Sequence, residues 1–156
     1  LGGLLIAVLY KFSTLISVSV LVELQPSVDA KLAYVTSGPA GWSDLFVRAV
    51  LCNLMINLAM LLVYNGIIKD DLTRSLVMVV SVLIFAFHGL EHSVANTVLF
   101  TIVGLVSGIN VVAAAGNIAI ALLGNFVGGG LLIGLYYAYV NDDRAYLKGR
   151  GTSVGS

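Results

Sequence analysis

Charged side chains are scarce in this chain. Asp, Glu, Lys and Arg make up 10% of the 156 residues, whereas 59% are hydrophobic and the mean hydropathy is +1.02. A soluble domain usually has about 25% charged and roughly 45–50% apolar residues. The composition therefore argues against an ordinary soluble domain and indicates a chain built for a membrane.

Other absences exclude further classes of protein. The net charge is zero and the pI is near 6.9, so the chain lacks the basic field that a nucleic-acid partner requires. Its single cysteine, Cys52, excludes an internal disulfide framework and a cysteine-rich zinc site. No basic segment or small-residue cleavage site precedes the first apolar residues, which argues against a removable signal peptide. Because the chain begins at Leu1 inside an apolar stretch, we expect it to be part of a longer protein.

Long apolar stretches predict a bundle of membrane helices. A span needs about 20 mostly apolar residues. We expect a membrane domain over residues 1–140, with spans at about 1–10, 43–64, 74–88 plus 93–106, and 117–140. Ser43-Asp44 offers a helix start and Asn65-Gly66 a helix stop for the second span.

Three segments between and after these spans are predicted to lie outside them. Residues 23–42, which hold both prolines, are predicted to form an extramembrane connection, and residues 107–116 another connection. Residues 141–156 form a polar tail. The tail and the loop after the second span carry more basic residues than the opposite side, so the positive-inside rule places the C-terminus on the cytoplasmic side. The membrane expected is a plasma (inner) membrane.

The third span is interrupted by His88, Gly89, Glu91 and His92. Ionisable groups at this depth are costly and usually mark a transport path. Gly89 weakens the helix, and a broken helix presents free N–H groups that favour an anion. Asn96, one turn further on, can add a hydrogen-bond donor. The plain alternative is that Glu91 and His92 satisfy each other and hold two helices together.

A zinc-protease interpretation of the same interruption is disfavoured. Residues 88–92 spell H-x-x-E-H, a pattern that needs an unbroken helix and a third protein ligand. Gly89 breaks the helix, and the only later acids, Asp142 and Asp143, lie in the polar tail. We therefore predict no metal, no cofactor and no enzyme activity.

Three motifs carry a resemblance to a known family. Residues 51–54 read L-C-N-L, residues 89–96 read G-L-E-H-S-V-A-N, and residues 123–130 read L-G-N-F-V-G-G-G. In this order they resemble the L-C-N-W stretch, the G-[FY]-E-H-S-[IV]-A-N signature and the glycine-rich final span of the formate/nitrite transporter family. The resemblance covers nearly the whole chain, from the end of the third span through the sixth.

The resemblance implies an all-α, aquaporin-like channel fold of six spans in two inverted halves. It also implies a homopentamer in which each protomer has its own pore. The family moves small monovalent anions of weak acids, such as formate, nitrite, hydrosulfide, lactate or acetate, often together with a proton. The substrate partners implied are therefore a small anion and protons, within a lipid bilayer.

By motif, the resemblance makes His92 the central pore histidine and Glu91 its neighbour. Asn53 and Asn96 correspond to pore-side hydrogen-bond partners. Lys31 corresponds to a lysine that draws anions into the vestibule, although a solvated loop lysine is an equal alternative.

Two apolar residues, Ile56 and Phe85, correspond to the constrictions of the pore, and the alternative for both is ordinary packing against lipid or core. His88 departs from the family pattern, which has a small residue there, so a second titratable group is expected near the pore. Asp44 and Arg48 lie four residues apart near one end of the second span, where an ion pair is expected and a vestibule role is also open.

The expected mechanism is that an anion takes a proton with the help of His92 and crosses the apolar constrictions as a neutral acid. In a weaker version, His92 only attracts the anion electrostatically. An aquaporin-like neutral-solute pore is the alternative, disfavoured because an Asn-Pro-Ala motif is absent. A structural membrane subunit is the other alternative, with helix packing at Gly124-x-x-x-Gly128 and Gly130-x-x-x-Gly134.

Overall fold

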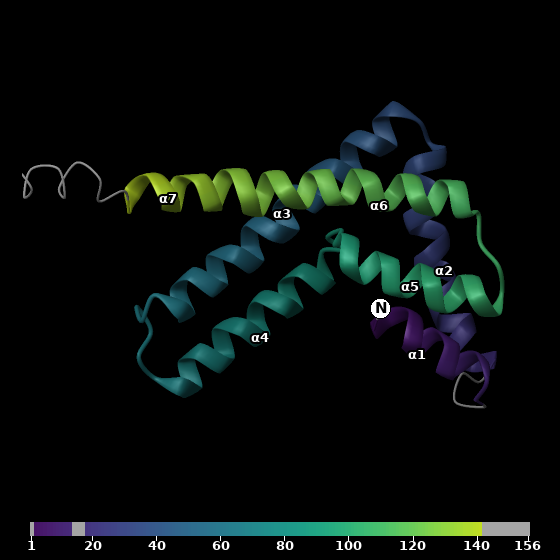
Figure 1. Cartoon of the computed structure of the whole chain (residues 1–156), viewed down its shortest axis with the longest axis horizontal. Coiled ribbons are helices and arrows are strands. Elements are labelled where there is room, and N and C mark those ends of the chain that lie inside the picture. Colours follow the sequence, from purple (N-terminus) through teal and green to yellow (C-terminus); the bar gives the residue numbers. More distant parts are fainter. Residues whose placement is uncertain (1, 14–17, 142–156) are drawn as a thin grey trace, which may run out of the picture.

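The computed structural model describes residues 2–13 and 18–141, which fold into helices without any strand (Figure 1). The elements are α1 (Gly2–Lys11), α2 (Val18–Thr36), α3 (Pro39–Tyr64), α4 (Asp71–Phe87), α5 (Ser93–Val106), α6 (Val111–Asn125), the π-helix η1 (Phe126–Leu135) and α7 (Tyr136–Val140). The predicted all-α class is confirmed for these residues. The C-terminal residues of the predicted polar tail, 142–156, lie outside the described part.

Two long apolar helices form the frame of the structure. α3 has 26 residues, and α6, η1 and α7 continue one another as a rod of 30 residues from Val111 to Val140. Both are long and apolar enough to cross a membrane. The rod lies across α3 in Figure 1, and α3 packs against both α6 and η1.

Glycines allow these two helices to approach closely. A Cβ atom on Gly124 would lie 2.6 Å from the Cβ of Ala49, and one on Gly128 would collide with the backbone carbonyl of Val50. Small residues let helix backbones touch in this way. Gly130 and Gly134 instead have their closest neighbours within η1 itself, so of the two predicted packing pairs only the first lies between helices.

The predicted break in the third span is confirmed. α4 ends at Phe87, Gly89 adopts a left-handed φ of 57°, and α5 begins at Ser93. The Leu90 N–H donates to the carbonyl of Phe85 at 3.1 Å, a bond that closes the end of α4. The two half-helices meet near the centre of the molecule (Figure 1).

The segment predicted as a connection, residues 23–42, is mostly helical. α2 covers it up to Thr36 with Pro26 inside, and packs on α3, α5 and α6. An interior proline removes one backbone hydrogen bond, which the packing offsets, because Val28 is fully buried against Phe100 and Val103. Tertiary packing thus outweighs the local signal that favoured a loop.

One predicted helix start is also wrong, the last predicted span lies within a longer helix, and one stop is confirmed. α3 begins at Pro39 rather than Ser43, because Gly38 has a positive φ of 73° and proline is favoured at a first helical position. The last helix begins at Val111 rather than residue 117, with Asn110 accepting from the Ala113 N–H at 3.0 Å. Asn65 ends α3 as predicted, followed by Gly66 at a φ of 68°.

Candidate functional site

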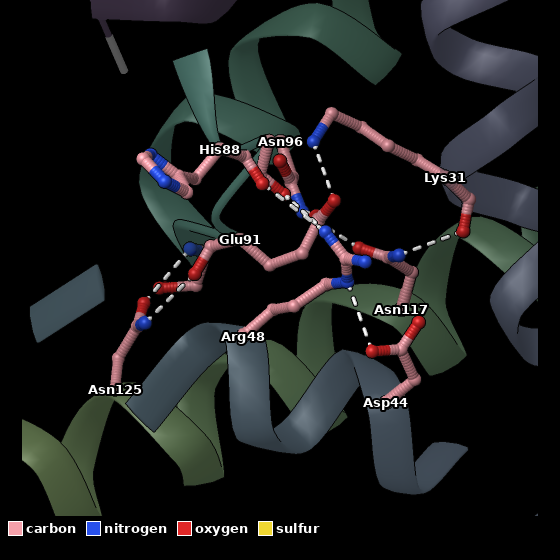
Figure 2. A network of polar contacts seen from close by, with 10 residues as sticks. Lys31, Asp44, Arg48, His88, Glu91, Asn96, Asn117 and Asn125 are labelled. Atoms are coloured by element: carbon pink, nitrogen blue, oxygen red, sulfur yellow. Dashed lines mark hydrogen bonds and ion pairs between the residues drawn. The ribbon is translucent and has the colours of Figure 1, made fainter. Parts of the chain in front are cut away.

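A network of buried polar side chains surrounds the helix break (Figure 2). Polar groups in an apolar interior are costly unless they are hydrogen-bonded. Among the described residues, every buried side-chain nitrogen and oxygen has a hydrogen-bond partner. The buried polar residues are Glu91, Ser93, Asn96, Asn117 and Asn125.

Glu91 is the charged centre of this network. Its side chain is 2% exposed, and its Oε1 accepts a hydrogen bond from the Lys31 ammonium at 2.8 Å. Its Oε2 accepts from the Asn96 amide at 2.6 Å. Glu91 therefore takes its side-chain hydrogen bonds from Lys31 and Asn96. This differs from the plain alternative, in which Glu91 and His92 satisfy each other. Lys31 lies on α2, and its ammonium is engaged in this ion pair instead of being a solvated loop lysine.

Asn117 ties three helices together around the ion pair. Its Oδ1 accepts from the Asn96 amide at 2.8 Å, and its Nδ2 donates to the backbone carbonyl of Lys31 at 2.9 Å. α2, α5 and α6 thus share one closed set of hydrogen bonds. Sequence reasoning missed Asn117, although an asparagine at the start of a predicted apolar span was a usable signal.

Asn125 holds the break against α3. Its Nδ2 donates to the carbonyls of Ala49 at 2.8 Å and Glu91 at 3.0 Å, and its Oδ1 accepts from the Ser93 N–H at 2.9 Å. One side chain therefore satisfies backbone groups on α3, in the break and at the start of α5. Asn125 lies inside the glycine-rich motif, but its role is nonlocal and the sequence did not predict it.

His92 caps α5 and borders a cavity. Its Nδ1 accepts from the Val94 N–H at 3.2 Å. The first two N–H groups of α5, those of Ser93 and Val94, are thus bound within the chain, although the predicted anion site would use free ones. The half-buried His92 lines a cavity of about 490 Å³ together with Asn53 and Asn125.

The other predicted site residues do not all line the His92 cavity. Asn53 shares the His92 cavity, and its Nδ2 donates to the Asn125 carbonyl at 2.9 Å. Asn96 is 1% exposed and lies in the Glu91 network rather than in the cavity. Ile56 on α3 and Phe85 on α4 are partly buried, and neither lines the His92 cavity.

Arg48 supports the break from α3. Its Nε pairs with Asp44 at 2.9 Å, which confirms the predicted ion pair. Its Nη1 donates to the carbonyl of His88 at 3.1 Å, and its guanidinium lies 5.6 Å from the centre of the Tyr34 ring. The exposed ring of His88 bonds to the Ile84 carbonyl at 2.9 Å and points away from the Glu91 carboxylate (Figure 2).

Two apolar helices long enough to span a membrane, packed around a polar network at a broken helix, are consistent with a helical membrane protein. The chain belongs to the formate/nitrite transporter family, whose model matches residues 1–139.

Two relatives support this assignment. The chain is 32% identical over 150 residues to the uncharacterized transporter YwcJ of Bacillus subtilis, a match that covers 92% of this chain and 56% of that protein. It is 26% identical over 120 residues to the formate channel FocA of Haemophilus influenzae, covering 64% of this chain and 41% of that protein. The chain thus spans about half the length of these curated relatives. No solved structure matches the chain.

Proposed function

We propose that the complete protein is a channel-type transporter for small monovalent anions of weak acids, with formate, nitrite and hydrosulfide as the first candidates and lactate or acetate as further ones. It would lie in the plasma (inner) membrane with its C-terminus in the cytoplasm, as a homopentamer of aquaporin-like protomers. The observation that carries the proposal is the pocket at the helix break that both His92 and Asn53 line, next in the chain to Glu91 of the buried ion pair.

The Lys31–Glu91 ion pair makes this site compatible with anions. An unpaired carboxylate so close to the cavity would repel an approaching anion. With the Lys31 ammonium at 2.8 Å, the pair has no net charge. The polar atoms left to meet the anion are then those of His92 and the asparagines that line the cavity.

The His92 ring has a defined donor atom. Because Nδ1 accepts from the Val94 N–H, the neutral ring carries its proton on Nε2. That N–H can donate a hydrogen bond to a bound anion. To pass on a proton, the ring must first take one up at Nδ1, which displaces the Val94 N–H. The imidazolium can then give its Nε2 proton to an oxygen of formate or nitrite, or to the sulfur of hydrosulfide, and the acid crosses without charge.

In the weaker version of this proposal, His92 donates a hydrogen bond or attracts the anion and never gives up a proton. One observation favours the structural-subunit alternative, namely that Glu91, Asn96 and Asn117 bond to one another and to Lys31 in a closed set. Transport measurements separate these possibilities.

The test uses proteoliposomes that contain the complete polypeptide to which this chain belongs. Uptake of formate, nitrite or hydrosulfide is followed together with internal pH under an imposed pH gradient. We expect the wild type to move at least one anion with protons, and His92→Asn to lose the proton coupling. His88→Asn is the matched control, because its ring is exposed and outside the cavity, and it should behave as wild type. If the wild type moves none of these anions, the transport proposal is wrong.

A further inference from the structure

Asn57 lies where two cavities meet. It follows Asn53 by one turn of α3 and lines the His92 cavity of about 490 Å³. It also lines a second cavity of about 230 Å³, bordered by Tyr64 near the end of α3 and by Tyr137 on α7. Gly129 is the other residue that lines both cavities. The two hollows adjoin at Asn57 and Gly129, and together they are called the passage below.

The Asn57 carboxamide has a defined orientation. Its Nδ2 donates to the backbone carbonyl of Asn53 at 2.8 Å, and a carbonyl can only accept. The nitrogen is therefore held against α3, and Oδ1 takes the opposite position of the amide. Within residues 2–13 and 18–141, no group donates a hydrogen bond to this oxygen. It remains an acceptor available to a molecule in the passage.

The backbone of η1 makes room for this amide. A Cβ atom on Gly129 would lie 2.7 Å from Nδ2 of Asn57, so any side chain there would displace the carboxamide. The remaining lining of the second cavity is largely apolar, including Met60, Leu61 and Ile133. Asn57 thus places a hydrogen-bonding group in a passage with few others.

An amide oxygen distinguishes between the two forms of a weak acid. It accepts a hydrogen bond from the O–H of the neutral acid, and its partial negative charge disfavours the bare anion. The second N–H of the carboxamide, which could donate to an anion, lies on the nitrogen that packs against Asn53 and Gly129. Resting on the proposed function, we propose that Asn57 is a specificity-determining residue of the transport path. Its Oδ1 selects the protonated acid over the anion on the side of His92 that leads to Tyr64 and Tyr137.

The experiment compares Asn57→Ala with Asn57→Ser in proteoliposomes of the complete polypeptide, with formate as substrate. Serine can donate to the carbonyl four residues back, as Ser81 does to Val77 at 2.7 Å, and still offer oxygen lone pairs. Alanine offers none. The readout is the ratio of electroneutral acid uptake to electrogenic formate current in the same vesicles, which does not depend on the amount of folded protein.

We expect Asn57→Ala to lower this ratio about two- to tenfold, the factor that one hydrogen bond between neutral groups provides, and Asn57→Ser to stay near wild type. An unchanged ratio in Asn57→Ala, or equal losses in both variants, would overturn the role of Asn57. Those outcomes leave wild-type transport intact, whereas failure of the proposed function is a wild type that moves no formate, nitrite or hydrosulfide.

Discussion

Replacing Lys31 by methionine would leave the Glu91 carboxylate buried without its cation. Methionine has a similar length, so the change removes the charge and keeps most of the packing. Removing one partner of a buried ion pair typically costs about 3–5 kcal/mol. Glu91 is 2% exposed and Lys31 20% exposed, so we expect the loss of unfolding free energy to fall near the lower end of that range.

The double variant Lys31→Met/Glu91→Gln shows how much of this loss belongs to the uncompensated charge. Glutamine keeps an oxygen that accepts from Asn96, so the bond seen at 2.6 Å survives in neutral form. No charge is then buried, and the unpaired amide hydrogens of the new glutamine, which face the position of the former Lys31 partner, cost less than a bare carboxylate, so the double variant should lose less stability than Lys31→Met alone. We expect a coupling energy of at least about 2 kcal/mol between the two positions.

Unfolding of the complete polypeptide in mixed micelles, followed by circular dichroism as the SDS fraction rises, measures these free energies. The matched control is the ion pair between Arg74 and Asp71, whose carboxylate is 95% exposed. Asp71→Asn removes this pair and keeps the bond that Arg74 Nε donates to the Ile68 carbonyl at 2.7 Å, so it should leave the transition nearly unchanged, because exposed pairs contribute little. A coupling energy below about 0.5 kcal/mol between Lys31 and Glu91 would refute the inference that this ion pair is shielded from water and stabilises the fold.

Three further predictions follow from local contacts. Gly124→Ala should cost about 1–3 kcal/mol in the same unfolding assay because its Cβ meets α3 at 2.6 Å, whereas Gly134→Ala, with its nearest neighbour at 3.4 Å, should not. The pKa of Asp70 is lowered because its carboxylate accepts from the N–H and hydroxyl of Thr73. This stabilisation is complete above the ordinary pKa of about 3.9 and is lost as pH falls through the lowered value. The protection factor of the Thr73 amide, relative to its intrinsic exchange rate, should therefore fall only below about pH 4, and Asp70→Asn should abolish that pH dependence. Arg48→Lys should keep one partner and lose the others, since a lysine lacks the fork of donors, and faster hydrogen exchange of the amides at the helix break would show it.

Much of the local structure could be predicted from the sequence. The break at residues 88–92 follows from Gly89, which adopts a backbone angle that other residues avoid. The end of α3 at Asn65 and the ion pair between Asp44 and Arg48 depend on residues within one turn of each other. Such features depend on residues that are close together in the chain, so they can be predicted from the sequence.

The candidate site was only partly predictable. His92 and Asn53 carried motifs and do share a cavity, but Asn96 was expected beside them and lies in the ion-pair network instead. Asn57 carried no motif, and its position between two cavities appears only when η1 packs on α3. Which face of a helix borders a cavity depends on the neighbouring helices, and sequence spacing alone does not decide it.

By itself, the sequence determined the membrane character of the protein, its helical class and the place of the broken helix, because composition and local backbone preferences suffice for these. Tertiary structure alone decided that α2 forms despite Pro26, and that Lys31 reaches Glu91 across 60 residues. It also decided that Asn117 and Asn125 satisfy the break. The physical reason is that a buried polar group takes whichever partner the packing of distant helices brings within hydrogen-bond distance.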